Sequence, residues 1–169
     1  MKSTLKRLDS VHQALSASVN NLDPALFPRR PGENEWSVAE VVHHLCLVEE
    51  RVLKDLTKSV QGAPANVSPW KKLIPMRMVS VRFKRFKAPK AVEPLGTLPK
   101  DELLNTYDEI RSRLKQFCAD HGAPRLRKAL FKHPFLGDLD GVAAVSMVAF
   151  HEQRHNKQIR EIVKKLTSL

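Results

Sequence analysis

The side chains best suited to chemistry in this sequence are His151 and His155, which lie four residues apart near the C-terminus. On an α-helix of about 100° per residue their imidazoles would be about 40° apart, on the same face as the apolar Val148 and Ile162. Neutral imidazole nitrogens bind divalent metals at about 2.0–2.1 Å, and two histidines one turn apart can reach the same ion. A pair of core histidines held by hydrogen bonds is the alternative that these two residues leave open.

The same residues form the pattern His-Glu-x-x-His, which in one class of zinc proteases supplies two ligands and a general base. Gln158 and Glu161 stand where the longer protease pattern requires glycine and histidine, and no strand pattern is present to hold an extended peptide. We therefore do not expect a protease. Glu152 lies about 100° from His151 on the helix, and we expect its carboxylate at the rim of the site or on the surface.

Four long amphipathic patterns, separated by proline and glycine, predict four helices. They cover about residues 3–21, 37–60, 101–121 and 140–166. Ser37, followed three residues later by Glu40, has the sequence of a capping box at the start of the second helix. No segment shows the period-two alternation of a β-strand, so we expect an all-α protein built as a four-helix bundle.

The connection between the second and third helices is unusually long. Residues 61–100 contain six prolines, and we expect a short helix over 70–84 within them, because a structureless loop of this length is rare in a compact domain. Two helices joined in this way need not be antiparallel neighbours, which allows a bundle with a crossover. The length of 169 residues suits one domain, so we expect residues 1–169 to form a single unit.

The second helix offers the third candidate ligand. Its apolar stripe contains Val41 and Val48, and His44 lies beside them, whereas His43 lies nearly opposite the centre of the stripe. We therefore expect His44 to face the core and His43 to face solvent. The remaining histidines have no partner at useful spacing or adjoin a glycine or proline, and we interpret them as structural: His12, His121 and His133.

Three segments of the chain together resemble the DinB-like (DinB/YfiT) superfamily of metal-dependent enzymes. Residues 36–45, Trp-Ser-Val-Ala-Glu-Val-Val-His-His-Leu, are similar to its W-S-x-x-E-x-x-x-H-L pattern. Residues 151–159 are similar to its terminal-helix signature H-x-x-R-H-x-x-Q-I, and residues 133–139 resemble the H-P-x-x-G-x-L entry into that helix. The order and spacing of the motifs extend the resemblance over essentially the whole chain.

The resemblance implies a four-helix bundle with a long crossover connection and a divalent metal ion, commonly nickel or zinc, held by three histidines. Carried over by position, these histidines are His44, His151 and His155. Members of the superfamily include transferases that use low-molecular-weight thiols and enzymes described as hydrolases. The resemblance therefore implies a metal-dependent transferase or hydrolase acting on a small molecule, with a thiol as a candidate cofactor.

Three histidine ligands would leave a coordination position open for a substrate or for a metal-bound water, whose pKa a zinc ion can lower to about 7. Gln158 and Glu49 could orient ligands or water from outside the coordination sphere, and hydrogen bonding between helices is the alternative for both. We expect Cys46 and Cys118 to be small side chains buried in the core. Sulfur chemistry would therefore come from an external thiol.

The net charge of +11 supports a competing interpretation. No acidic residue occurs between Asp55 and Glu93, whereas eight Lys and Arg residues lie within 71–90, interleaved with Phe83 and Phe86. This composition would suit a nucleic-acid- or membrane-surface-binding module in which the metal site is structural or vestigial. A solvated crossover that covers the bundle is the other interpretation, and we expect a small-molecule substrate rather than nucleic acid.

The composition is that of an ordinary folded protein, with 42% hydrophobic and 28% charged residues. The first residues lack the apolar region of a secretory signal, and no apolar run approaches the roughly 18 to 20 residues that span a bilayer. We therefore expect a cytoplasmic location. Whether the chain forms a homodimer is left open.

Overall fold

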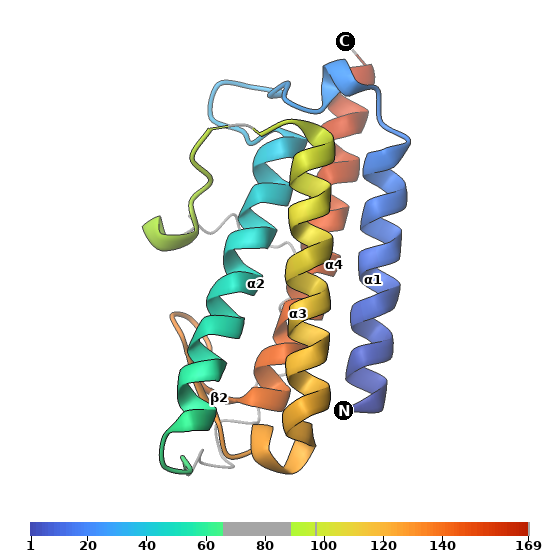
Figure 1. The fold of residues 1–169 in the computed structure, drawn as a ribbon. Helices are drawn as coiled ribbons and strands as arrows, with labels where there is room; N and C mark the ends of the chain where they lie inside the picture. The colour runs from blue at the N-terminus through green and yellow to red at the C-terminus, as the bar shows by residue number, and fades with distance from the viewer. Residues whose placement is uncertain (66–88, 97, 169) are drawn as a thin grey trace.

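The computed structural model describes residues 1–65, 89–96 and 98–168. Four long helices pack along one another as a bundle (Figure 1): α1 (Lys2–Asn20), α2 (Val38–Gln61), α3 (Lys100–Leu126) and α4 (Gly141–Thr167). Within these described ranges, the 3-10 turns η1 (Pro24–Leu26) and η4 (Lys90–Val92) lie in the connections, and the strands β1 (Leu130–His133) and β2 (Gly137–Asp140) precede α4. The predicted four-helix bundle is confirmed.

The four helices do not alternate in direction along the chain. Figure 1 shows that α1 and α4 run in the same direction, whereas α2 and α3 are parallel to each other and opposite to that pair. The connection from α2 to α3 must therefore return along the length of the bundle, as expected for a crossover. The predicted helix over 70–84 lies outside the described residues.

Side-chain caps explain where the two helices that carry the candidate ligands begin. The Ser37 hydroxyl accepts a hydrogen bond of 3.2 Å from the Glu40 N–H, and the Glu40 carboxylate accepts one of 2.8 Å from the Ser37 N–H. This is the predicted capping box of α2. At the start of α4, the Asp140 carboxylate accepts a hydrogen bond of 2.8 Å from the Ala143 N–H.

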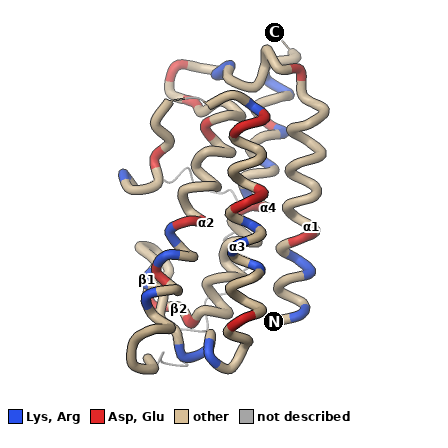
Figure 2. The backbone as a smooth tube through the Cα atoms, in the orientation of Figure 1, with Lys and Arg blue, Asp and Glu red and all other residues tan. Residues whose placement is uncertain are grey.

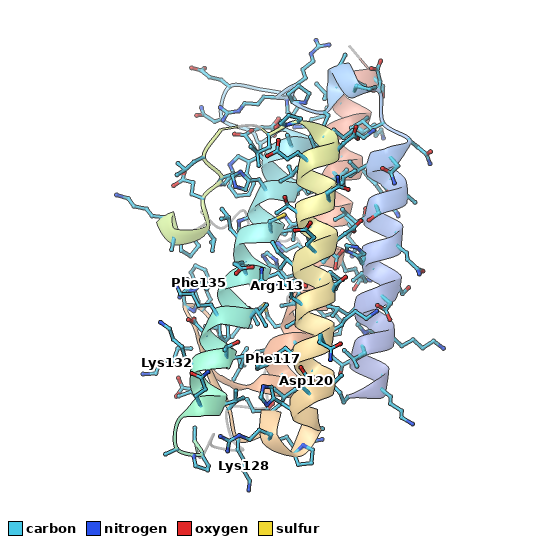
Figure 3. The ribbon with its side chains drawn as sticks, in the orientation of Figure 1. Arg113, Phe117, Asp120, Lys128, Lys132 and Phe135 are labelled. Atoms are coloured by element: carbon cyan, nitrogen blue, oxygen red, sulfur yellow. The ribbon has the colours of Figure 1, made fainter. Side chains whose placement is uncertain are left out.

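A two-stranded hairpin at the entry to α4 is an addition that sequence analysis missed. β1 and β2 pair in antiparallel fashion with Phe131 opposite Leu139, and both of these side chains are buried in the core. Each strand has four residues, which is too short for the alternation of apolar and polar residues to be recognised. The turn carries Phe135 out beside α2, where it is 60% exposed (Figure 3).

The apolar core has two parts separated along the bundle axis. The part at the hairpin end includes Leu8, Leu114 and Phe131, and the part at the other end includes Leu15 and Ile159. Between these two parts each helix contributes one polar side chain. We call these four residues the polar layer: His12, Glu49, Arg111 and Glu152.

Charged residues of both signs are distributed along the described backbone (Figure 2). Seven of the 29 Lys and Arg residues lie within 66–88, which contain no Asp or Glu, so the described residues carry a net charge of +4 rather than +11. The charge that favours a binding module is therefore concentrated outside the described part of the chain. Among the described helices, none is long and apolar enough to cross a membrane.

Candidate metal site

Three histidines from two helices converge at one place in the bundle. His44 comes from α2, and His151 and His155 come from α4. One ring nitrogen of each lies within 4.8 Å of the corresponding nitrogens of the other two. The Nε2 atoms of His151 and His155 are 3.2 Å apart, close to the roughly 3.3 Å that separates two ligands bound tetrahedrally at about 2.05 Å. The donor set and its spacing therefore fit a divalent ion.

The second nitrogen of two of these rings is already engaged. His44 Nδ1 lies 2.7 Å from the backbone carbonyl oxygen of Val92 in η4, and His155 Nδ1 lies 2.9 Å from the Gln158 side-chain oxygen. An oxygen that accepts the Nδ1–H proton selects the tautomer in which Nε2 keeps a free lone pair. Both rings are thus held with Nε2 as the nitrogen available to a metal.

Burial favours the neutral form of all three rings. Burial is the largest cause that lowers the pKa of His44, and the nearby His43 acts in the same direction, although the hydrogen bond to Val92 opposes them. Burial, followed by repulsion between the neighbouring imidazolium charges, places the pKa of His151 and of His155 well below the ordinary value. A neutral imidazole is the form that binds a metal, so no proton has to be displaced at neutral pH.

Further side chains surround the three rings. The Trp36 ring lies 5.1 Å from the His44 ring between centroids, at an interplanar angle of 50°. Arg154 lies near enough to the ring nitrogens to disfavour a positive charge on His151 and His155. Together these residues give the site one aromatic wall and one cationic neighbour.

Gln158 and Glu49, both predicted to orient ligands or water from outside the coordination sphere, have different partners in the structure. Gln158 contacts His155 directly, as described above. Both carboxylate oxygens of Glu49 instead accept hydrogen bonds of 2.8 Å from Arg111 in α3. For Glu49, the alternative of hydrogen bonding between helices is the one observed.

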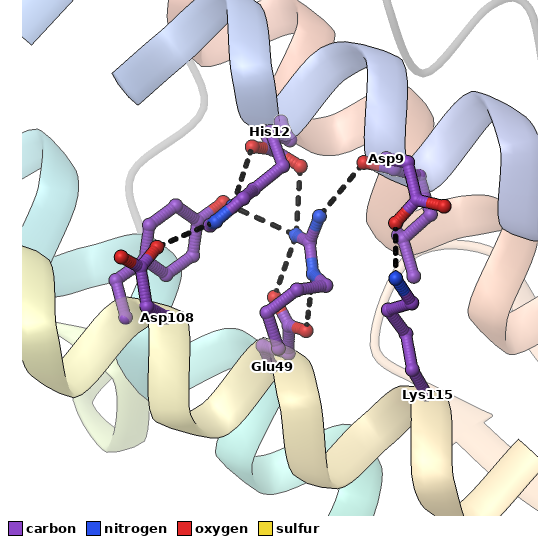
Figure 4. Close-up of polar contacts among 9 residues, drawn as sticks. Asp9, His12, Glu49, Asp108 and Lys115 are labelled. Carbon is purple, nitrogen blue, oxygen red and sulfur yellow. Dashed lines mark hydrogen bonds and ion pairs between the residues drawn. The ribbon is translucent and has the colours of Figure 1, made fainter. Parts of the chain in front are cut away.

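One expectation from the sequence was wrong, and it concerns the polar layer (Figure 4). Glu152, expected at the rim or surface, is fully buried and accepts a hydrogen bond of 2.8 Å from Arg111. His12, which we interpreted as structural, is outside the three-histidine group and lies 2.7 Å from Asp108 and 3.7 Å from Glu152. In both cases the partner comes from another helix, which the spacing of residues within one helix cannot reveal.

The other histidines stay apart from the site. His43, expected to face solvent, is partly exposed, and it is not part of the three-histidine group. The ring of the exposed His121 lies 4.6 Å from the Phe117 ring between centroids, at an interplanar angle of 60°. His133, expected in a loop, ends β1, where its Nδ1 accepts hydrogen bonds from the N–H groups of the hairpin turn.

Neither cysteine belongs to the site. Cys46 and Cys118 are buried free thiols. Burial, assisted by the charge of Glu49, raises the pKa of Cys46 to about 12 and that of Cys118 to about 11. Neither side chain is therefore available as a thiolate at neutral pH.

The hydrogen bond between His44 and Val92 could not be predicted from the sequence. Val92 reaches His44 through a backbone carbonyl, which every residue has, and it is 48 positions away along the chain. Only the fold of the crossover brings the two together.

Comparisons with known proteins point to one family and one fold. A family model described as the DinB superfamily matches residues 7–159. The chain is also similar to an uncharacterized protein, YuaE, of Bacillus subtilis (strain 168), with 29% identity over 139 residues that cover 82% of this chain and 83% of YuaE.

Two solved structures resemble the bundle. TT2238, described as a four-helix bundle protein, superimposes with a TM-score of 0.63 and 24% identity over 95% of this chain and 98% of its own. YfiT from Bacillus subtilis is described as a probable metal-dependent hydrolase with an unusual four-helix bundle topology. It superimposes with a TM-score of 0.68 and 16% identity over 98% of this chain and 87% of its own. At these identities the two structures establish a likeness of fold alone.

Proposed function

Because the chain belongs to the DinB superfamily, we propose that His44, His151 and His155 bind one divalent metal ion and that the protein is a metal-dependent enzyme acting on a small molecule. Zinc and nickel are the metals we favour. The reaction is the transfer of a group to a low-molecular-weight thiol or a hydrolysis. A cytoplasmic location remains part of this proposal.

The convergence of three neutral imidazoles carries the proposal. Their nitrogens lie within 4.8 Å of one another, which is the spacing of ligands around one ion rather than of separate core residues. When bound, a divalent ion with three protein ligands would supply a Lewis acid with an open position for substrate or thiol. His44 and His155 would be kept in the binding tautomer by Val92 and Gln158.

Two observations bear on whether the reaction is thiol transfer or hydrolysis. YfiT, which shares the fold, is described as a probable hydrolase. The buried Cys46 and Cys118 cannot supply a thiolate, so a thiol-dependent reaction would require a soluble thiol. Arg154, close to two of the rings, would favour a substrate or thiol with an anionic group.

Metal analysis of the purified protein tests the proposal. We expect close to one divalent ion per chain in the wild type, and strong loss of the ion in His44→Ala, His151→Ala and His155→Ala. His43→Ala is the matched control, because it removes the adjacent histidine of the same helix and should leave the metal in place. If His43→Ala removes the ion and His44→Ala retains it, the assignment of ligands is wrong.

Activity assays then separate the two reactions. Metal-loaded protein should be screened with small electrophiles in the presence and absence of small thiols, and with simple ester and amide substrates. Turnover that requires the thiol would establish transfer, and turnover without it would establish hydrolysis. Efficient cleavage of peptides would contradict the proposal of a small-molecule substrate.

A further inference from the structure

A single guanidinium connects all four helices at the middle of the bundle. Arg111 of α3 donates from Nε and Nη2 to the two carboxylate oxygens of Glu49 in α2, each at 2.8 Å. Its Nη2 also donates to Glu152 of α4 at 2.8 Å, and its Nη1 donates to the backbone carbonyl of Leu8 in α1 at 2.8 Å. Figure 4 shows the hydrogen bonds between this guanidinium and the labelled Glu49.

The three ionisable side chains of this network are buried. Arg111, Glu49 and Glu152 are 3%, 1% and 0% exposed. Burying ions is costly, and replacing a buried ion network by apolar side chains of similar volume is often neutral or even stabilising. A gain in the stability of the fold is therefore a weak explanation for this buried ion network, whereas the geometry that it imposes on the helices is a stronger one.

The carboxylate partners of Arg111 lie on the two helices that carry the candidate ligands. Glu152 directly follows His151 on α4, and Glu49 lies five residues after His44 on α2. The spacing between His151 and His155 is set within one helix. The position of His44 relative to that pair depends on how α2 lies against α4, and Arg111 holds one carboxylate from each of these helices.

We propose that Arg111 is a positioning residue for the three-histidine site. By holding Glu49 and Glu152 with one rigid, planar group, it sets the separation and rotation of α2 against α4, and with them the place of His44 opposite His151 and His155. A metal site requires such support, because ligand positions must be correct to within about 0.5 Å. This inference rests on the proposed metal site and extends it to a residue that touches none of the three rings in the described contacts.

Two variants test the role of Arg111 with cobalt(II), whose visible absorption reports the coordination geometry. Arg111→Lys keeps the charge and loses the forked geometry. The triple variant Glu49→Met, Arg111→Met, Glu152→Met removes the whole ion network while filling a similar volume with adaptable side chains. We expect both variants to bind cobalt about 10- to 100-fold more weakly than the wild type, with an altered spectrum.

Arg113→Lys is the matched control. Arg113 also joins α3 to α2, through hydrogen bonds of 3.0 and 3.1 Å to Glu50, but this pair is exposed and does not reach α4. We expect its cobalt affinity and spectrum to equal those of the wild type. Wild-type affinity and spectrum in a folded triple variant would overturn the proposal. So would loss of the cooperative fold in both Arg111 variants, because Arg111 would then serve the fold itself.

A measurement on the metal-free protein separates this inference from the proposed function. Ring-nitrogen NMR signals of His44 should shift in the Arg111 variants, whereas those of the exposed His121 should not. If the wild type binds no cobalt, the proposed metal function fails, yet the His44 signals still decide whether Arg111 sets the position of that ring. Unchanged His44 signals in both variants would overturn the positioning role.

Discussion

His44 Nδ1 lies 2.7 Å from the carbonyl oxygen of Val92, so a candidate metal ligand in α2 is held by the crossover that leads to α3. Val92 is itself 4% exposed, and its side chain anchors η4 against the bundle. The connection between α2 and α3 therefore contributes to the site as well as to the topology. It also offers a way to perturb the site without touching a ligand.

Val92→Gly should weaken metal binding by roughly tenfold, the lower end of the effect expected for a hydrogen-bond partner of a ligating histidine. The substitution removes the buried side chain that holds the carbonyl in place. Competition with a chelator would measure the change. Ala91→Gly is the control, because Ala91 is an exposed residue of the same turn, and equal affinities in the two variants would contradict a role for the carbonyl of Val92.

His133 should make the protein less stable in mild acid. Burial, with a contribution from the charge of Arg51, lowers the pKa of His133 to about 4. Its Nδ1 can then accept hydrogen bonds of 3.1 Å from the N–H groups of both Phe135 and Leu136. The unfolded chain, with a histidine pKa near 6.5, takes up this proton first as the pH falls. The contribution of neutral His133 to the free energy of unfolding is therefore fully present above about pH 6.5. As the pH falls toward 4, this free energy decreases by on the order of 1–3 kcal/mol.

Urea unfolding at pH 7 and pH 4.5 would measure this effect. His133→Asn keeps an oxygen that can accept the same turn hydrogen bonds but does not titrate. We expect the variant to lose less stability than the wild type between these two pH values. An equal loss in both proteins would show that His133 does not couple folding to pH.

The two cysteines should resist alkylation in the folded protein. With pKa values of about 12 for Cys46 and about 11 for Cys118, only a minute fraction of either is thiolate at pH 8. Mass spectrometry after iodoacetamide treatment should find the native protein unmodified under conditions in which the urea-unfolded protein reacts at both sites.

The double variant Cys46→Ser, Cys118→Ser should accordingly retain its metal and any activity found for the wild type. Loss of activity with the metal still bound would mean that an internal sulfur takes part in the reaction. The proposal of an external thiol would then have to be abandoned.

The basic crossover should bind DNA only weakly at physiological salt. Replacing Arg82, Lys84, Arg85 and Lys87 with Gln tests this prediction, because each phosphate contact contributes roughly 0.9 to the slope of log affinity against log salt concentration. We expect little change in either affinity or slope. A salt-resistant, sequence-selective complex that the substitutions abolish would favour the binding module over the enzyme.

Helical periodicity predicted much of this structure because it acts within each element. The apolar stripe of α2 placed His44 inward, and the four-residue spacing placed His151 and His155 on one face, and the structure brings these three together. The capping box at Ser37 was visible because both of its partners are local. Patterns within a single helix can be recognised in the sequence without knowledge of the fold.

The features that the sequence did not reveal depend on contacts between elements. Glu152 and Arg111 are 41 residues apart, and Arg111 and Leu8 are 103 apart. A charged residue is normally assigned to the surface, so a buried carboxylate is predictable only when its buried guanidinium partner is known. The hairpin was missed for a different reason, since only Phe131 and Leu139 mark its inward face.

The polar layer also constrains how the helices can be aligned. Apolar stripes repeat nearly every turn, so a helix in an otherwise apolar bundle can slide by one turn, about 5.4 Å, and still bury a similar surface. In this protein such a slip of α1, α2 or α4 would pull Leu8, Glu49 or Glu152 away from Arg111. A slip of α2 or α4 would leave a buried carboxylate unpaired, at a cost of several kcal/mol. The polar layer thus favours one axial register of the four helices over registers shifted by a helical turn.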